Sequence, residues 1–269
     1  MRGLVSRDWP RRTKPFIRYA LRRANLVLSS SQELLDMAHG QGVKKERLHV
    51  MGFGVDTQMF NPEVNTQILQ EQLNLGPGPV VLSPRPMLPM YGLLRIVEAI
   101  PKVLQAFPTC TFIFQTRSEH HRPEYEAELK SRLIQLGVGY SVRILPQRPY
   151  EEMPALFACA DVIVSVPSAD AASNSVFEGM ACGAFPVISD IPAFRGWVRH
   201  EENGLLLQTI EADQVADAIV RALSDKNLAS TIRTNNLELI RTRQSASYWT
   251  DRLEELYRAT VAGKSYSHA

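Results

Sequence analysis

Cysteine is scarce in this sequence. Cys110, Cys159 and Cys182 are spread over 269 residues, and none of them lies in a Cys-x-x-Cys or Cys/His spacing. An odd number of widely separated cysteines excludes a disulfide framework and a zinc site as the basis of the fold, and it favours a reducing compartment. We therefore expect a cytoplasmic protein that works without a metal ion or other cofactor.

Long apolar runs are missing as well. No stretch approaches the ~20 apolar residues that are needed to span a bilayer, and the first residues lack the apolar core of a secretion signal. The formal net charge is only +2, so no global field indicates a nucleic-acid partner. Any membrane contact is expected to be peripheral, at the inner membrane surface.

A basic cluster near the start is the exception to this even distribution of charge. The cluster consists of Arg11, Arg12, Lys14, Arg18, Arg22 and Arg23. One interpretation is a solvated helix face, which is the usual role of such a run. The other is a patch that meets phosphates or lipid head groups. Both interpretations stay open at this stage.

The pattern of apolar residues, which make up 45% of the chain, predicts the fold class. Short apolar runs are expected to form strands at 80–83, 111–115, 142–145, 161–166, 186–189 and 204–207. Segments with helical periodicity alternate with them at 93–107, 123–136, 150–160 and 175–182, followed by a helical tail over 211–262. This alternation is typical of an α/β protein with a doubly wound parallel sheet. In such a sheet, ligands bind at the carboxyl ends of the strands.

The first 55 residues form a separate, shorter pattern. Helices are expected at 11–24 and 31–40, and strands at 26–29 and 48–51. Two βα units are too few for an independent doubly wound domain. A Gly-Pro-Gly-Pro turn at 76–79 marks the start of the larger α/β pattern.

The loop and helix after the strand at 161–166 carry the strongest candidate site. Asp170 lies in a stretch of small polar residues, Asn174 or Ser175 is expected to cap the next helix, and Glu178 is expected in its first turn. A helix N-terminus offers unpaired N–H groups that suit a diphosphate, while the two carboxylates can accept hydrogen bonds from sugar hydroxyls. The alternative is an ordinary capped loop with a carboxylate that stabilises the helix dipole.

These residues resemble the acidic-x7-acidic motif of glycosyltransferase family 4, which consists of retaining enzymes with the two-domain GT-B fold. Seven residues separate Asp170 from Glu178, and the following EGMACGAFPV is similar to the family pattern. Three further segments resemble family landmarks and occur in the family's order: GFGVDTQMFNP at 52–62, LSPRPMLPMYG at 82–92 and NGLLL at 203–207.

The resemblance implies a role for each matching residue. Glu178 would bind the ribose of a nucleotide-diphosphate sugar, Asp170 would contact the sugar, and Arg85 would stabilise the leaving diphosphate. Further donor contacts are expected from the start of the helix, at Ser173, Asn174, Ser175 and Val176.

Two positions depart from the family pattern. Asp170 is shorter than the usual Glu, and Tyr91 occupies the place of a Lys that would add a second cation to the phosphate-binding loop. A phenol cannot replace that charge. For Arg85 itself, an ordinary surface salt bridge is the alternative role.

The resemblance also implies a division of the chain. Residues 1–55 would be a remnant of the acceptor-side domain, 56–245 the nucleotide-sugar-binding domain with a Rossmann-like fold, and 246–269 a crossover helix and tail. Most of the acceptor-binding sheet is therefore expected to be absent.

Three functions follow as hypotheses. The first is a hexosyltransferase that acts on a saccharide or lipid-linked acceptor. The second is a non-catalytic nucleotide-sugar-binding module, or a fragment that needs a separate acceptor domain. The third is a Rossmann-like domain of another chemistry, which would bind NAD or a flavin.

Overall fold

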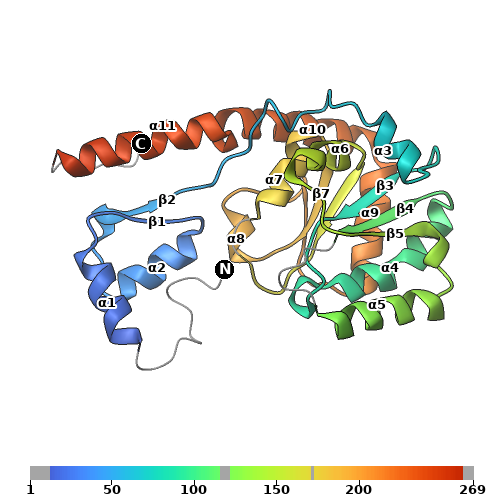
Figure 1. Ribbon diagram of the computed structural model, residues 1–269, viewed down its shortest axis with the longest axis horizontal. Helices are drawn as coiled ribbons and strands as arrows, with labels where there is room; N and C mark the ends of the chain where they lie inside the picture. Colours follow the sequence, from blue (N-terminus) through green and yellow to red (C-terminus); the bar gives the residue numbers. More distant parts are fainter. Residues whose placement is uncertain (1–12, 116–121, 171–172, 263–269) are drawn as a thin grey trace.

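The computed structural model describes residues 13–115, 122–170 and 173–262. A six-stranded parallel sheet with the order β5-β4-β3-β6-β7-β8 forms its centre (Figure 1). Its strands are β3 (Val80–Ser83), β4 (Thr111–Gln115), β5 (Val142–Leu145), β6 (Val162–Ser165), β7 (Phe185–Ser189) and β8 (Leu205–Leu207). The chain builds β3, β4 and β5 toward one edge and then returns to the other side of β3 with β6. The strand order therefore reverses between β3 and β6.

Helices cover both faces of this sheet, which confirms the predicted α/β class with a doubly wound parallel sheet. One core packs α4 (Leu93–Ala106), α5 (Pro123–Gln135) and α9 (Ala212–Ser224) against one face. The second core packs α3 (Gln67–Gln72), α6 (Met153–Ala158), α7 (Asn174–Ala181) and α8 (Pro192–Arg195) against the other. Because both faces are covered, every residue of β3, β4, β6 and β7 is buried. This explains the continuous apolar runs of these strands.

The first part of the chain forms a smaller lobe. It contains α1 (Lys14–Arg23), α2 (Gln32–Gly40) and the parallel strands β1 (Val27–Ser29) and β2 (Leu48–Val50). A small apolar core holds these elements together, with Leu35 and Ala38 of α2 almost fully buried. Ser31 caps α2, as expected, because its hydroxyl accepts a hydrogen bond from the Leu34 N–H at 3.3 Å.

The helical tail predicted over 211–262 consists of three α-helices, α9, α10 and α11. After α9, the Asp225 side chain caps α10 (Lys226–Leu239) by accepting from the Leu228 N–H at 3.0 Å. A π-helical turn (Ile240–Gln244) then leads into α11 (Ala246–Val261). Between the last two elements, Ser245 is extended and bridges to Val55.

The bridge at Val55 joins the segment that follows the smaller lobe to the chain just before α11. The Val55 N–H donates to the Gln244 carbonyl at 2.7 Å, and the Ala246 N–H donates to the Val55 carbonyl at 2.8 Å. From there α11 runs back toward β1 and β2 (Figure 1). A single pattern of helical periodicity could not reveal this junction, since its partner lies almost 200 residues away in the sequence.

Smaller differences concern short elements. The helix expected at 150–160 starts as a 3-10 turn, η5 (Tyr150–Glu152), and continues as α6. The helices α3 and α8 were not predicted, because six and four residues are too few to show a periodicity. The other 3-10 turns are η1 (Lys45–Arg47), η2 (Pro89–Tyr91) and η4 (Gly139–Ser141). Arg11 and Arg12 of the basic cluster, and 171–172 of the candidate loop, lie outside the described residues.

Candidate functional site

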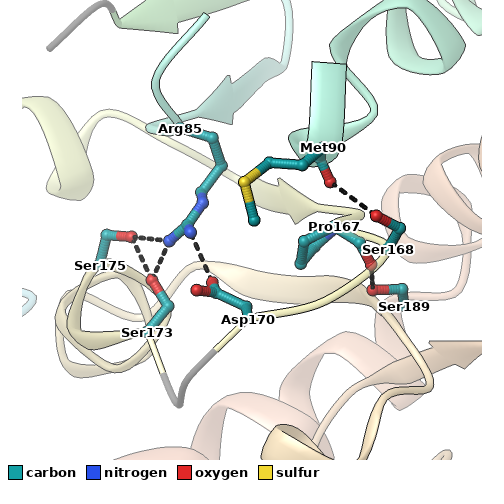
Figure 2. Close-up of polar contacts among 8 residues, drawn as sticks. All are labelled: Arg85, Met90, Pro167, Ser168, Asp170, Ser173, Ser175 and Ser189. Atoms are coloured by element: carbon teal, nitrogen blue, oxygen red, sulfur yellow. Dashed lines mark hydrogen bonds and ion pairs between the residues drawn. The ribbon is translucent and has the colours of Figure 1, made fainter. Parts of the chain in front are cut away.

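Two loops meet where the strand order reverses, one after β3 and one after β6. Gly92 makes their close approach possible: its φ is +67°, and a Cβ there would lie 2.5 Å from the Val166 carbonyl oxygen. The Ser168 N–H also donates to the Met90 carbonyl at 2.9 Å. Figure 2 shows the Ser168 side chain directed at the same carbonyl. The two loops thus contact each other closely at the carboxyl end of the sheet, where ligands bind in this class of fold.

Arg85 extends from the first loop to residues of the second loop and of α7 (Figure 2). Its Nη2 forms an ion pair with Asp170 Oδ2 at 2.5 Å. Its Nη1 donates to the hydroxyls of Ser173 and, at 3.4 Å, of Ser175. The Arg85 side chain is only 8% exposed and that of Asp170 14%. The pair is therefore largely shielded from solvent, unlike an ordinary surface salt bridge.

Two further features of the Arg85 guanidinium are a ring contact on its face and a buried Nε atom. The Tyr91 ring lies over it, with 4.2 Å between Arg85 Cζ and the ring centroid. The Arg85 Nε is buried and has no hydrogen-bond partner among the described residues. A buried donor without a partner costs free energy, which a ligand oxygen would recover.

Helix α7 begins one residue earlier than expected, and its cap differs from the prediction. Ser173 is the N-cap residue, with φ −86° and ψ 119°, but its side chain makes no capping hydrogen bond. Its hydroxyl contacts Arg85 and, at 2.8 Å, the Ser175 hydroxyl instead. Neither Asn174 nor Ser175 is therefore the expected cap residue. The Ser173 and Ser175 hydroxyls contact Arg85 instead of the helix end.

Glu178 and Val176 lie deeper in α7. Glu178 falls in the second turn of α7 instead of the first, and the first turn contains no acidic residue. Its carboxylate is buried, and the Tyr150 hydroxyl donates to its Oε1 at 3.3 Å. The Val176 side chain is fully buried in the core, and its N–H donates to the Ser173 carbonyl at 3.1 Å.

Sequence reasoning missed two residues of this site, Tyr150 and the stacked Tyr91. Tyr150 follows β5 by a few residues, so its place at the carboxyl end of a predicted strand was the available signal. Tyr91 was identified only as a missing lysine. Its contact with Arg85 depends on the course of the loop, which the residue pattern does not determine.

Cys182, which lies close to Glu178, has low reactivity near neutral pH. Burial raises the pKa of Cys182 to about 12, and the Glu178 carboxylate adds to the shift. Burial likewise raises the pKa of Cys110 to about 12. Both thiols therefore stay protonated near neutral pH and are poor nucleophiles or metal ligands.

The described residues contain neither a metal-binding cluster nor a membrane-spanning helix. No group of three or more His, Cys, Asp or Glu side chains in the described part of the chain is placed to hold a metal ion. None of the described helices combines the length and the apolar character needed to cross a bilayer.

The fold is that of the Rossmann-like half of GT-B glycosyltransferases. Anabaena HepE, crystallised with UDP-glucose, superposes with a TM-score of 0.85 at 21% identity, over 96% of this chain and 71% of the other. The C-terminal domain of LpcC, a group 1 glycosyl transferase of Francisella tularensis, superposes with a TM-score of 0.64 at 21% identity. That match covers 71% of this chain and 99% of the other.

The family follows from the sequence match. Residues 65–238 fit the family described as glycosyl transferases group 1, and the chain belongs to this family. It is 26% identical over 220 residues to the D-inositol 3-phosphate glycosyltransferase of Jonesia denitrificans, a match that covers 78% of this chain and 51% of the relative. The chain spans about half the length of the curated relatives it matches.

Proposed function

We propose that this chain holds the donor site of a retaining glycosyltransferase of family 4, which transfers a hexose from a nucleotide-diphosphate sugar. The observation that carries the proposal is the buried Arg85, which lies at the reversal of the strand order beside the start of α7. A buried guanidinium next to a helix N-terminus suits the negative charge of a leaving diphosphate. Group 1 membership favours this ligand over NAD or a flavin.

Each of the other residues of the site would contact a different part of the donor. We assign the ribose hydroxyls to the Glu178 carboxylate and the transferred sugar to Asp170. The residues at the start of α7, Ser173, Asn174 and Ser175, would contact the phosphates. Because Arg85 and the helix end supply positive charge, we propose transfer without a metal ion.

The acceptor belongs to the second part of the proposal. We assign residues 1–55 to an acceptor-side domain, 56–245 to the donor domain and 246–269 to a crossover helix and tail. The acceptor would be a saccharide or a lipid-linked sugar. A non-catalytic donor-binding module is the alternative, because transfer requires donor and acceptor to be held together. Release of UDP or GDP from UDP-glucose or GDP-mannose by this chain would contradict the alternative.

Glu178 provides the test of the ribose assignment. We expect the unsubstituted chain to prefer UDP or GDP over the matching 2′-deoxynucleotide by about tenfold, the value of one hydrogen bond to a charged group. The variant Glu178→Gln should lose this preference, as measured by calorimetric titration. Glu202→Gln is the control, because the Glu202 side chain is 63% exposed and pairs with Arg199. An unchanged preference in Glu178→Gln would contradict the assignment.

We also propose a peripheral contact between α1 and an anionic membrane at the inner surface. Residues 1–50 contain eleven Lys or Arg and four Asp or Glu, whereas the whole chain has 30 and 28. On the side of α1 away from its core, Phe16 is 76% and Tyr19 63% exposed. The Arg23 guanidinium lies over the Tyr19 ring, 5.6 Å from its centroid. Aromatic rings among cations fit the interface of an anionic bilayer.

Vesicle sedimentation tests this contact. We expect binding to vesicles with 30% phosphatidylglycerol, a composition of about one anionic lipid in three that attracts basic segments. The double variant Phe16→Ser and Tyr19→Ser should lose most of it. The matched control is Ile134→Ser with Tyr140→Ser, since these side chains are equally exposed on a distant surface. Equal binding by both double variants, or binding to purely zwitterionic vesicles, would contradict the contact.

A further inference from the structure

The Arg85 guanidinium is held from two directions by groups of different chemistry. In its plane, Asp170 and the two serine hydroxyls accept its N–H groups. On its face, the Tyr91 ring lies 4.2 Å from Cζ. Among these four partners only Asp170 is charged. Asp170 is therefore the group with which an incoming diphosphate has to compete for the N–H donors of Arg85.

The Tyr91 ring is fixed independently of Asp170. Tyr91 closes the 3-10 turn η2, and its N–H donates to the Leu88 carbonyl at 3.0 Å. Its side chain is half-buried against the larger core of the domain. The next residue is Gly92, whose close approach to the Val166 carbonyl locks the turn onto the neighbouring loop. The position of the ring thus depends on its own turn and on the start of the loop after β6, and not on the Asp170 carboxylate.

Donor binding would exchange one anion for another on the same cation. While the site is empty, Asp170 neutralises a guanidinium that would otherwise be buried without a counter-charge. When a diphosphate takes over the Nη2 donor, the carboxylate is released and the unpartnered Nε can donate as well. During this exchange the ring is the restraint that continues to define the plane of the guanidinium, and bidentate binding depends on that plane.

We propose that Tyr91 is the positioning residue for the diphosphate of the donor: it holds Arg85 in orientation through its ring face while Asp170 gives way. This inference rests on the proposed donor site. It assigns to the tyrosine a function that differs from that of the lysine it replaces. The tyrosine adds no charge, and instead it orients the one cation that is present.

Binding of nucleotides to two variants of Tyr91 tests the proposal. Tyr91→Phe keeps the ring, whereas Tyr91→Met keeps a comparable apolar volume without it. We expect Tyr91→Met to weaken binding of UDP or GDP about tenfold, and Tyr91→Phe to stay within about twofold, since a desolvated cation–π contact has this strength. Binding of uridine or guanosine, which carry no phosphate, should be the same in all three proteins.

Two results would overturn the proposal: nucleotide binding by Tyr91→Met equal to that of the unsubstituted chain, or equal losses in both variants. If the unsubstituted chain binds neither UDP nor GDP, the donor assignment itself fails. The contact with Arg85 is then tested by the proton resonance of its Nε–H, identified by its absence in Arg85→Lys. This resonance should show a ring-current shift in the unsubstituted chain and in Tyr91→Phe, and no such shift in Tyr91→Met. A resonance at the same position in all three proteins also overturns the proposal.

Discussion

Replacing Arg85 by methionine should weaken the binding of UDP or GDP by about 100-fold, because two hydrogen bonds from a buried cation to phosphate oxygens are lost. Methionine fills much of the same space, so the loops should keep their course. Titration calorimetry measures the effect directly. The conservative variant Arg85→Lys should lose about tenfold, since a lysine offers a point charge without the planar fork.

A second Arg–Asp pair, whose arginine is exposed, serves as the control for Arg85. Arg195 pairs with Asp190 at 2.7 Å, but its side chain is 60% exposed. We expect Arg195→Met to change nucleotide binding by less than about twofold, because screened surface pairs contribute little. Since Arg85→Met also leaves Asp170 without its cation, its folding is checked by urea unfolding and by nucleoside binding. An Arg85→Met variant that is folded and binds UDP or GDP normally would contradict the phosphate assignment.

Gly92→Ala should lower the free energy of unfolding by about 3 kcal/mol, which is the sum of two costs. The φ of +67° places any L-residue in the left-handed region, at about 1 kcal/mol or slightly more. The added Cβ would also lie 2.5 Å from the Val166 carbonyl, so one of two tied loops has to shift. Because these loops carry Arg85 and Asp170, nucleotide binding should fall with stability.

Gly137 is the matched control for this prediction. Its φ is +68°, yet no atom lies within 4 Å of the position of an added Cβ. Gly137→Ala should therefore cost only the backbone term of about 1 kcal/mol, and it should leave nucleotide binding unchanged. Urea unfolding of both variants separates the two terms. Equal losses of stability would show that the close approach to Val166 contributes nothing.

The elements that the sequence predicted best are those whose signal is local. The strands 80–83 and 111–115 match β3 and β4 at both ends, because a strand buried on both faces is a continuous apolar run between polar turns. Ser31 was recognised as a cap for a similar reason, since the hydroxyl and the N–H that it binds are three residues apart. The motif residues were likewise found within one short segment.

Features that the sequence did not predict depend on partners far away in the chain. The helical tail is interrupted where Ser245 meets Val55, and no periodicity within the tail contains that information. Ser173, the N-cap residue of α7, makes no capping hydrogen bond because its hydroxyl contacts Arg85 at a separation of 88 residues. In both cases a tertiary contact replaced the local one.

By itself, the sequence determined the α/β class, the parallel sheet and the short list of candidate residues, because apolar periodicity and motif spacing are properties of neighbouring residues. The tertiary structure alone decided how those candidates are used. It brings Arg85 and Asp170 together across 85 residues, buries the pair, and lays the Tyr91 ring over the cation. The physical reason is the reversal of strand order between β3 and β6, which places two loops that are distant in the sequence at the same end of the sheet.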